Sequence, residues 1–174
     1  MTPEFSRPER AETIGINERT VTIAADEGER QRLARRFAIL SIEQLEATLS
    51  IRREATGIVV QGRVTGAVTQ ACSATGEPLL APIDEPVALR FVDALDEAEE
   101  VELSADALDT LPIEGGIIDL GEAAAETMAL ALDPFPRAPD AAAKLAEAGV
   151  LGEAEADVGP FGALADLKRR LSGE

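Results

Sequence analysis

The chain has 174 residues, of which 45% are hydrophobic, and this length and composition allow one buried core. With a formal net charge of −17, one Cys and no His, it cannot form an intramolecular disulfide, and a tetrahedral zinc site would need at least three carboxylate ligands. No apolar run approaches the roughly 18 residues that cross a bilayer, so we expect no membrane contact. The sequence also has no phosphate-binding loop and no metal cluster, so we expect no cofactor. Residues 1–8 lack the apolar run of a secretory signal, which predicts a cytoplasmic protein.

The acidic excess lies in the second part of the chain. Residues 1–63 contain ten Arg and ten Asp or Glu, whereas residues 64–174 contain six basic and twenty-three acidic side chains. Proteins that bind nucleic acid need clustered Lys and Arg, and single-strand binders add aromatic side chains, of which this chain has only five Phe. The acidic surface is better suited to basic partners, although such a charge also serves solubility alone.

The first predicted elements are two strands and a helix. Alternating apolar residues predict a strand at residues 20–24, and residues 26–37 have the period of a short amphipathic helix rich in Arg. A second strand at residues 45–51 precedes a turn at Gly57, and its apolar positions share one face. These positions are Leu45, Ala47, Leu49 and Ile51.

The middle of the chain is predicted to supply the rest of a sheet. Residues 58–72 indicate one long strand, or two strands that meet at a bend, with Gly62 and Gly66 marking a bulge or a tight curve. Strands at residues 79–83 and 87–92 follow. The connections are short, which favours antiparallel pairing because parallel strands need long crossovers.

An acidic stretch separates these strands from a predicted helix. Residues 93–109 carry eight carboxylates and no basic residue, which indicates an exposed excursion from the sheet. Further on, Asp119 can cap a helix that runs to about Leu132, with Glu122 in the position of a capping box. The predicted fold class is α+β, with a curved, mainly antiparallel sheet over residues 20–103 and a packing helix.

The end of the chain is acidic and compositionally simple. Residues 138–159 are rich in Ala and predict either a flexible tether or, over residues 140–148, a short helix. Residues 160–174 predict an amphipathic helix with a basic last turn, which we call the C-terminal hook. We therefore divide the chain into an α+β domain at residues 1–137 and a tether with its hook at residues 138–174. The apolar side of the hook consists of Phe161, Leu164, Leu167 and Leu171.

Three blocks of the sequence resemble one known family. They are residues 70–79 with Cys72, Glu77 and Pro78, residues 115–122 with Asp119, Leu120 and Gly121, and residues 133–137. In this order they resemble the YceD-like family, described as large ribosomal RNA subunit accumulation proteins, over roughly residues 13–137. The resemblance implies that the six named residues are structural. Many relatives carry a second Cys where this chain has Thr75, so a metal or disulfide role is not carried over.

The resemblance also implies a function. It suggests a non-enzymatic bacterial factor that supports the accumulation or processing of large-subunit (23S) ribosomal RNA. The expected partner is a basic ribosomal protein or a large-subunit precursor, and a weak contact with ribosomal RNA is a further expectation. Two alternatives stay open, a small enzyme that works through carboxylates and an acidic interaction scaffold with no ribosomal role.

Cys72 and the pair of Asp119 and Glu122 are the side chains most suggestive of chemistry. A catalytic Cys usually relies on a neighbouring His or another cation, and the chain has no His, so we interpret Cys72 as a small buried hydrophobe. An offset of three residues at a helix start is what capping requires, which favours a cap over an acid–base pair. We therefore predict no catalytic residue and no metal ligand.

Three groups of residues are candidates for partner contact. Phe135 and Arg137 follow the helix-ending Pro134 in an extended stretch suited to recognition, although packing of Phe135 into the core explains the same pattern. The apolar side of the hook is a second candidate. The third group can contact RNA or a partner, or can form ion pairs with the acidic second part of the chain. Its members are Arg35, Arg36, Arg52, Arg53 and Arg63.

The hook generates a first prediction. Deleting residues 160–174 should leave the Tm of the remaining chain nearly unchanged and reduce its association with pre-ribosomal particles, because a simple-sequence tether lets the hook move independently. Thermal unfolding followed by circular dichroism checks the first part, and gradient co-sedimentation checks the second. A fall of many degrees in the Tm would mean that Phe161 and Leu164 pack on the protein's own core.

Overall fold

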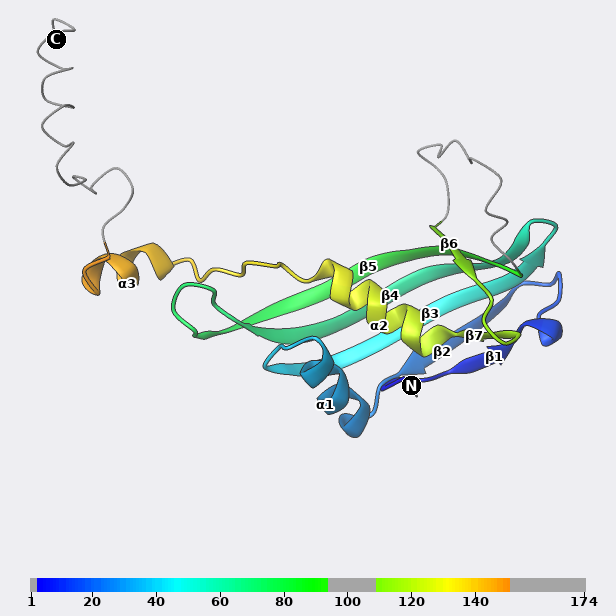
Figure 1. The fold of residues 1–174 in the computed structure, drawn as a ribbon, viewed down its shortest axis with the longest axis horizontal. Helices are drawn as coiled ribbons and strands as arrows, with labels where there is room; N and C mark the ends of the chain where they lie inside the picture. Colours follow the sequence, from blue (N-terminus) through cyan, green and yellow to red (C-terminus); the bar gives the residue numbers. More distant parts are fainter. Residues whose placement is uncertain (1–2, 94–108, 151–174) are drawn as a thin grey trace, which may run out of the picture.

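The computed structural model describes residues 3–93 and 109–150, and in them a five-stranded sheet, a two-stranded sheet and short helices (Figure 1). The hook and most of the acidic excursion lie outside the described residues. The elements are β1 (Pro8–Arg10), the 3-10 helix η1 (Ala11–Thr13), β2 (Arg19–Ala24), α1 (Glu27–Arg36), β3 (Ser41–Glu54), β4 (Gly57–Ala71), β5 (Pro78–Val92), β6 (Asp109–Pro112), β7 (Ile117–Asp119), α2 (Leu120–Ala131) and α3 (Ala141–Glu147).

The large sheet has the strand order β2-β3-β4-β5-β6, and all its pairs are antiparallel except β5 with β6. The predicted α+β class with a mainly antiparallel sheet is thus confirmed. One detail differs from the prediction, because the predicted strands at 79–83 and 87–92 are one strand, β5. Of the two predicted forms of residues 58–72, the single long strand is the observed one. Sequence reasoning missed β1, β6 and β7, which have only three or four residues each.

β5 continues through three prolines because of its place in the sheet. Pro78, Pro82 and Pro86 share one parity, so their ring nitrogens all face the same edge of the strand. β4 pairs with β5 along its whole length, whereas β6 pairs only with Leu89–Val92. Proline is tolerated where its nitrogen faces away from a ladder, which places these nitrogens on the edge opposite β4.

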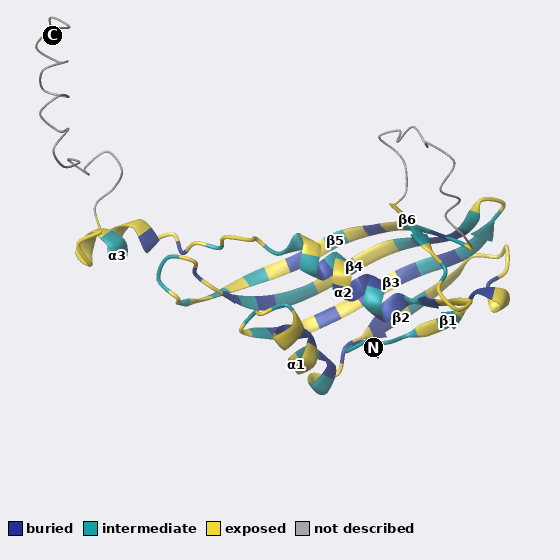
Figure 2. Cartoon of the chain, in the orientation of Figure 1, coloured by how far each residue is buried: buried dark blue, intermediate teal, exposed yellow. Residues whose placement is uncertain are grey.

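One face of the sheet is buried and the other is open. α2 crosses the buried face in contact with β4 and β5, and α1 packs beside β3 (Figure 1). Figure 2 shows the buried positions repeating along β3, β4 and β5, as expected for strands with one covered face. The centre of this core is formed by Leu33, Leu45, Leu49, Ile51, Ile58, Val60, Val64, Val68, Leu120, Ala124 and Met128.

Close approach of β3 explains the two glycines of β4. A Cβ atom on Gly62 would lie 2.1 Å from the carbonyl oxygen of Thr48, and one on Gly66 would lie 2.4 Å from that of Gln44. The predicted bulge occurs on the partner strand, where the register shifts between Ile42 and Gln44. Both glycines therefore allow β3 to pack closely against β4, and Gly66, which pairs with Leu45, does so next to the place where the register changes.

The two longer helices begin with acidic caps. In α1 the cap is a complete capping box, in which Asp26 accepts from the Glu29 N–H and Glu29 accepts from the Asp26 N–H. In α2 the Asp119 carboxylate accepts from the N–H groups of Gly121 at 3.0 Å and Glu122 at 3.2 Å, so the predicted cap is confirmed. The Glu122 carboxylate does not complete a box, because it binds Arg36 instead.

The N-terminal segment links the starts of both helices. Asp119 accepts hydrogen bonds from the backbone N–H of Arg7 at 2.7 Å and from the Ser6 hydroxyl at 2.5 Å. The Arg7 guanidinium then donates to both oxygens of Glu29, at 2.7 and 2.9 Å. Phe5 is fully buried beside this link, and the Phe5 carbonyl leaves no room for a Cβ at Gly121. Gly121 is therefore required where the segment crosses the start of α2.

Asp119 should be the most sensitive carboxylate of this link. Replacing Asp119 with Ala removes the helix cap and leaves the Arg7 N–H without its acceptor, so the free energy of unfolding should fall by about 2–4 kcal/mol. Urea denaturation measures the change. Asp133→Ala is a matched control, because among the described residues the Asp133 carboxylate accepts only from the Phe135 N–H in an exposed turn, and it should cost less than about 0.5 kcal/mol. Equal losses in both variants would contradict this account of the N-terminal segment.

Candidate functional site

The turn between β4 and β5 surrounds the sulfur of Cys72. The sulfur accepts a hydrogen bond from the backbone N–H of Ala138 at 3.4 Å, and the side chain of Thr75 bonds to it as well. These bonds, with that of Thr75 the strongest cause, lower the pKa of the Cys72 thiol to about 7 because they favour the thiolate. The side chain is buried, as the sequence predicted, and its hydrogen-bond partners are Thr75 in the turn and Ala138 after α2.

This turn also binds the segment that follows α2. Cys72, Ala138 and Ala141 form a small apolar cluster apart from the main core, and α3 begins at the last of them. The Lys144 ammonium of α3 binds both oxygens of Glu77, at 2.5 and 2.7 Å. Of the two predicted forms of residues 140–148, the helix is the observed one. The division of the chain at residue 137 stays a prediction.

The remaining family-motif residues have structural contacts. Asp119 caps α2 and binds the N-terminal segment, while Leu120 is buried in the main core. Pro78 is the first residue of β5. The Glu122 carboxylate is bound to Arg36 at 2.6 and 2.9 Å, so Asp119 and Glu122 act in two different contacts.

Most of the candidate basic residues are engaged within the protein. Arg36, Arg52 and Arg63 each form ion pairs, and the Arg53 guanidinium donates to the backbone carbonyls of residues 11 and 14. Arg35 is exposed, and its side chain forms no hydrogen bond or ion pair with any described residue. The structure does not bring the five together, because Arg36 precedes β3 whereas Arg52 and Arg53 are near its end. The ion pairs are Arg36 with Glu4 and Glu122, Arg52 with Glu18 and Glu54, and Arg63 with Asp84.

One basic residue of the open face was missed. Val59 lies directly between Arg52 on β3 and Arg90 on β5, so the three side chains form a row across the open face. Val59 is only 1% exposed although the sheet is uncovered here, which indicates that the two Arg stems pack over it. The Nε atom of Arg90 is buried without a hydrogen-bond partner. Its position beside Arg52 depends on the β4–β5 register, which the sequence pattern alone does not fix.

Phe135 and Arg137 lie in the extended stretch between α2 and α3. Phe135 is 74% exposed, so the alternative in which it packs into the core is wrong. Its N–H donates to the Asp133 carboxylate, which bends the chain just after α2. Arg137 is also exposed. Both side chains are therefore accessible for contact, and their role in binding a partner stays a prediction.

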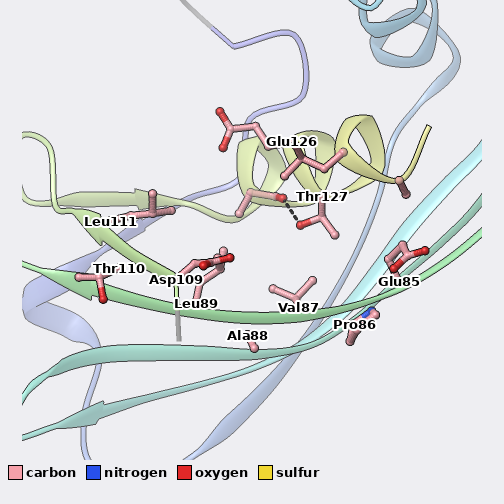
Figure 3. A pocket seen from close by; sticks show the side chains of 13 residues that line it. Glu85, Pro86, Val87, Ala88, Leu89, Asp109, Thr110, Leu111, Glu126 and Thr127 are labelled. Atoms are coloured by element: carbon pink, nitrogen blue, oxygen red, sulfur yellow. Dashed lines mark hydrogen bonds between the residues drawn. The ribbon is translucent and has the colours of Figure 1, made fainter. Parts of the chain in front are cut away.

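A groove of about 560 Å³ lies between α2 and the pair β5–β6, and we call it the acidic groove. In Figure 3 Val87 and Leu89 rise from β5 toward α2, which carries Glu126 and Thr127. Leu111 and Leu130 complete the apolar lining. Three carboxylates belong to the same lining, and none of them forms an ion pair with another described residue. They are Glu85, Asp109 and Glu126.

The described residues contain neither a membrane-spanning helix nor a cluster of metal ligands. None of their helices combines the length and the apolar composition of a bilayer-crossing segment. Nor do three or more Cys, Asp or Glu side chains of residues 3–93 and 109–150 converge as metal ligands would. The candidate residues Phe161, Leu164, Leu167 and Leu171 lie outside the described residues.

The Cys72 turn generates a prediction about pH. Replacing Thr75 with Val should raise the pKa of the Cys72 thiol from about 7 toward its ordinary value of 9.0, measured by the ultraviolet absorbance of the thiolate in this single-Cys protein. Because the thiol ionises more easily in the folded chain, its contribution to stability is complete above pH 9 and is lost as the pH falls through about 7.

Cys72→Ser is the control for this titration. Its stability, measured by urea denaturation, should lack the rise between pH 7 and 9 that is expected of the unmodified chain. A Thr75→Val protein that titrates like the unmodified chain would show that the Thr75 hydrogen bond does not act on the sulfur.

The fold and these surfaces can now be compared with known proteins. The family model described as Large ribosomal RNA subunit accumulation protein YceD matches residues 60–168. This region starts and ends later than the residues 13–137 indicated by the sequence blocks, and it includes the Cys72 turn, α2 and every residue of the acidic groove. No curated protein and no solved structure matches the chain. Since the match covers more than half of the chain, the protein belongs to the YceD family of large ribosomal RNA subunit accumulation proteins.

Proposed function

We propose that this protein is a non-enzymatic ribosome-biogenesis factor that supports the accumulation or processing of 23S ribosomal RNA by contact with a basic ribosomal protein or a large-subunit precursor. The observation that carries the proposal is the family match over residues 60–168, whose description supports a role in ribosome biogenesis. The proposal places the protein in the cytoplasm, where such precursors assemble.

The charge of the molecule supports contact through protein. Ribosomal proteins are basic, and the chain has a net charge of −17 with its acidic excess after residue 63. The acidic groove adds three carboxylates that no described cation neutralises. Phosphate binding needs free cations, but Arg36, Arg52 and Arg63 already have carboxylate partners. We therefore propose that direct contact with RNA contributes less to binding than contact with protein.

The proposed RNA contact is limited to the open face of the sheet. Arg52, Arg63 and Arg90 project from this face, with small and polar residues between them. The ion pair of Arg63 is largely exposed and those of Arg52 are partly exposed, so phosphate can compete for these side chains, most easily at Arg63. Without aromatic side chains on this face, such a contact would be weak and would fall steeply with salt.

Gradient sedimentation tests the proposed function. In cells that lack their own copy of the gene, tagged full-length protein should travel with precursors of the large subunit and restore the ratio of 23S to 16S ribosomal RNA. Arg52→Glu with Arg63→Glu should leave sedimentation largely unchanged if protein contact dominates, and should abolish it if RNA contact dominates. A protein that stays at the top of the gradient while the RNA ratio is normal without it would support a scaffold with no ribosomal role.

A further inference from the structure

The acidic groove combines an apolar lining with three carboxylates. We propose that it binds a segment of the partner protein in which Lys or Arg side chains flank an aliphatic side chain. This deepens the proposed function by naming the surface and the chemistry of the protein contact, and it rests on that function only for the statement that the partner is ribosomal.

The edge of β5 in the groove offers more hydrogen-bond acceptors than donors. β6 pairs only with Leu89–Val92, so within the described residues the earlier part of β5 has no strand on this side. Pro82 and Pro86 face this edge with carbonyl oxygens and without N–H groups. A partner strand would find no N–H donor at either proline, so its ladder would lack a hydrogen bond at both positions. Lys and Arg side chains can instead donate to single carbonyl oxygens.

The three groove carboxylates are available to a partner's cations. Glu85, Asp109 and Glu126 form no ion pair with any described residue, and no Lys or Arg lines the groove. Glu122, one turn earlier on the same face of α2, has its carboxylate bound by Arg36, and it does not line the groove. A cation entering the groove therefore meets carboxylates that have no internal competitor.

The floor and rim of the groove suit an aliphatic side chain. Leu130 is 88% exposed at the end of α2, and Val87 on β5 forms a buried floor below the helix. Leu89 and Leu111, both partly buried, continue this apolar surface. Covering Leu130 with an aliphatic side chain of the partner removes apolar area from water, and the carboxylates around it set which flanking residues are accepted.

Titration of the isotope-labelled full chain tests the proposal by NMR. The probe is a short synthetic peptide with Lys residues on both sides of one Leu, and it should shift the resonances of Val87, Leu89, Leu111 and Leu130. A peptide with Ser in place of Leu should bind roughly tenfold more weakly, and one with Glu in place of Lys should not bind. Shifts spread evenly over the acidic surface would overturn the proposal.

Matched variants separate the groove from general charge. Glu85→Gln, Asp109→Asn and Glu126→Gln together should raise the Kd for the Lys–Leu peptide roughly tenfold. Replacing three exposed carboxylates elsewhere removes the same charge and should change the Kd less than about twofold. These controls are Glu27→Gln, Glu46→Gln and Glu147→Gln. Leu130→Ser should also weaken binding, with Leu40→Ser, exposed at another site, as its control.

Two other occupants are outcomes of the same experiment. If the chain's own basic residues near the C-terminus fill the groove, replacing Lys168, Arg169 and Arg170 with Glu in the full chain will shift the Leu130 resonance in the absence of peptide. If a second copy fills it, the same resonance will move with protein concentration. Either result overturns the proposal, as does equal weakening by the groove variants and their controls.

The gradient experiment distinguishes this proposal from the proposed function. If the full chain does not travel with precursors but the peptide binds the groove as expected, the ribosomal role fails and the groove chemistry holds. If the chain travels with precursors and the three groove substitutions leave its sedimentation unchanged, the function holds and the groove proposal fails.

Discussion

The arrangement of helices and sheet depends on one arginine near the start of the chain. Arg7 gives its backbone N–H to Asp119 at the start of α2 and its guanidinium to Glu29 in the first turn of α1. The guanidinium lowers the pKa of the buried Glu29 carboxylate, and the carboxylate in turn raises the pKa of Arg7. Both helix starts, where the dipole favours negative charge, are thereby fixed to one short segment.

Most Arg side chains elsewhere in the folded protein are also bound by internal acceptors. The first 63 residues have balanced charges, and in the folded protein most of their Arg side chains bind carboxylates or carbonyls. Arg36 and Arg63 reach acidic residues of the second part, at Glu122 and Asp84. These contacts occupy the cations, so Glu85, Asp109 and Glu126, beside β5, β6 and α2, have no ion-pair partner among the described residues.

Local patterns in the sequence predicted the elements well, and contacts between distant residues account for what they missed. Alternation from Leu45 to Ile51 identified a strand, and Asp119 identified a helix start, because both signals lie within a few residues. The Glu122 carboxylate has the spacing of a capping box, but Arg36 is 86 residues away in the sequence and outcompetes the local bond. β6 escaped notice because four residues that include Pro112 show no alternation.

The candidate sites follow the same rule. The burial of Cys72 followed from its residue type, whereas its contact with Ala138 depends on where the chain returns after α2. The exposure of Phe135 was one of two readings that composition allowed, and only the packing around α2 decides between them. Arg90 and the acidic groove are properties of strand register and of the β5–β6 pairing, neither of which a single sequence encodes locally.

The pairing of β1 with β7 has a consequence for how the chain folds during synthesis. β3, β4 and β5 are joined by short turns, so this meander can form as soon as its residues leave the ribosome. β1, in contrast, pairs Pro8 with Asp119 and must wait for more than a hundred further residues before its loop can close. Until then Phe5, fully buried in the finished protein, has no cover on the nascent chain, so its burial waits for Asp119 and the start of α2 to emerge.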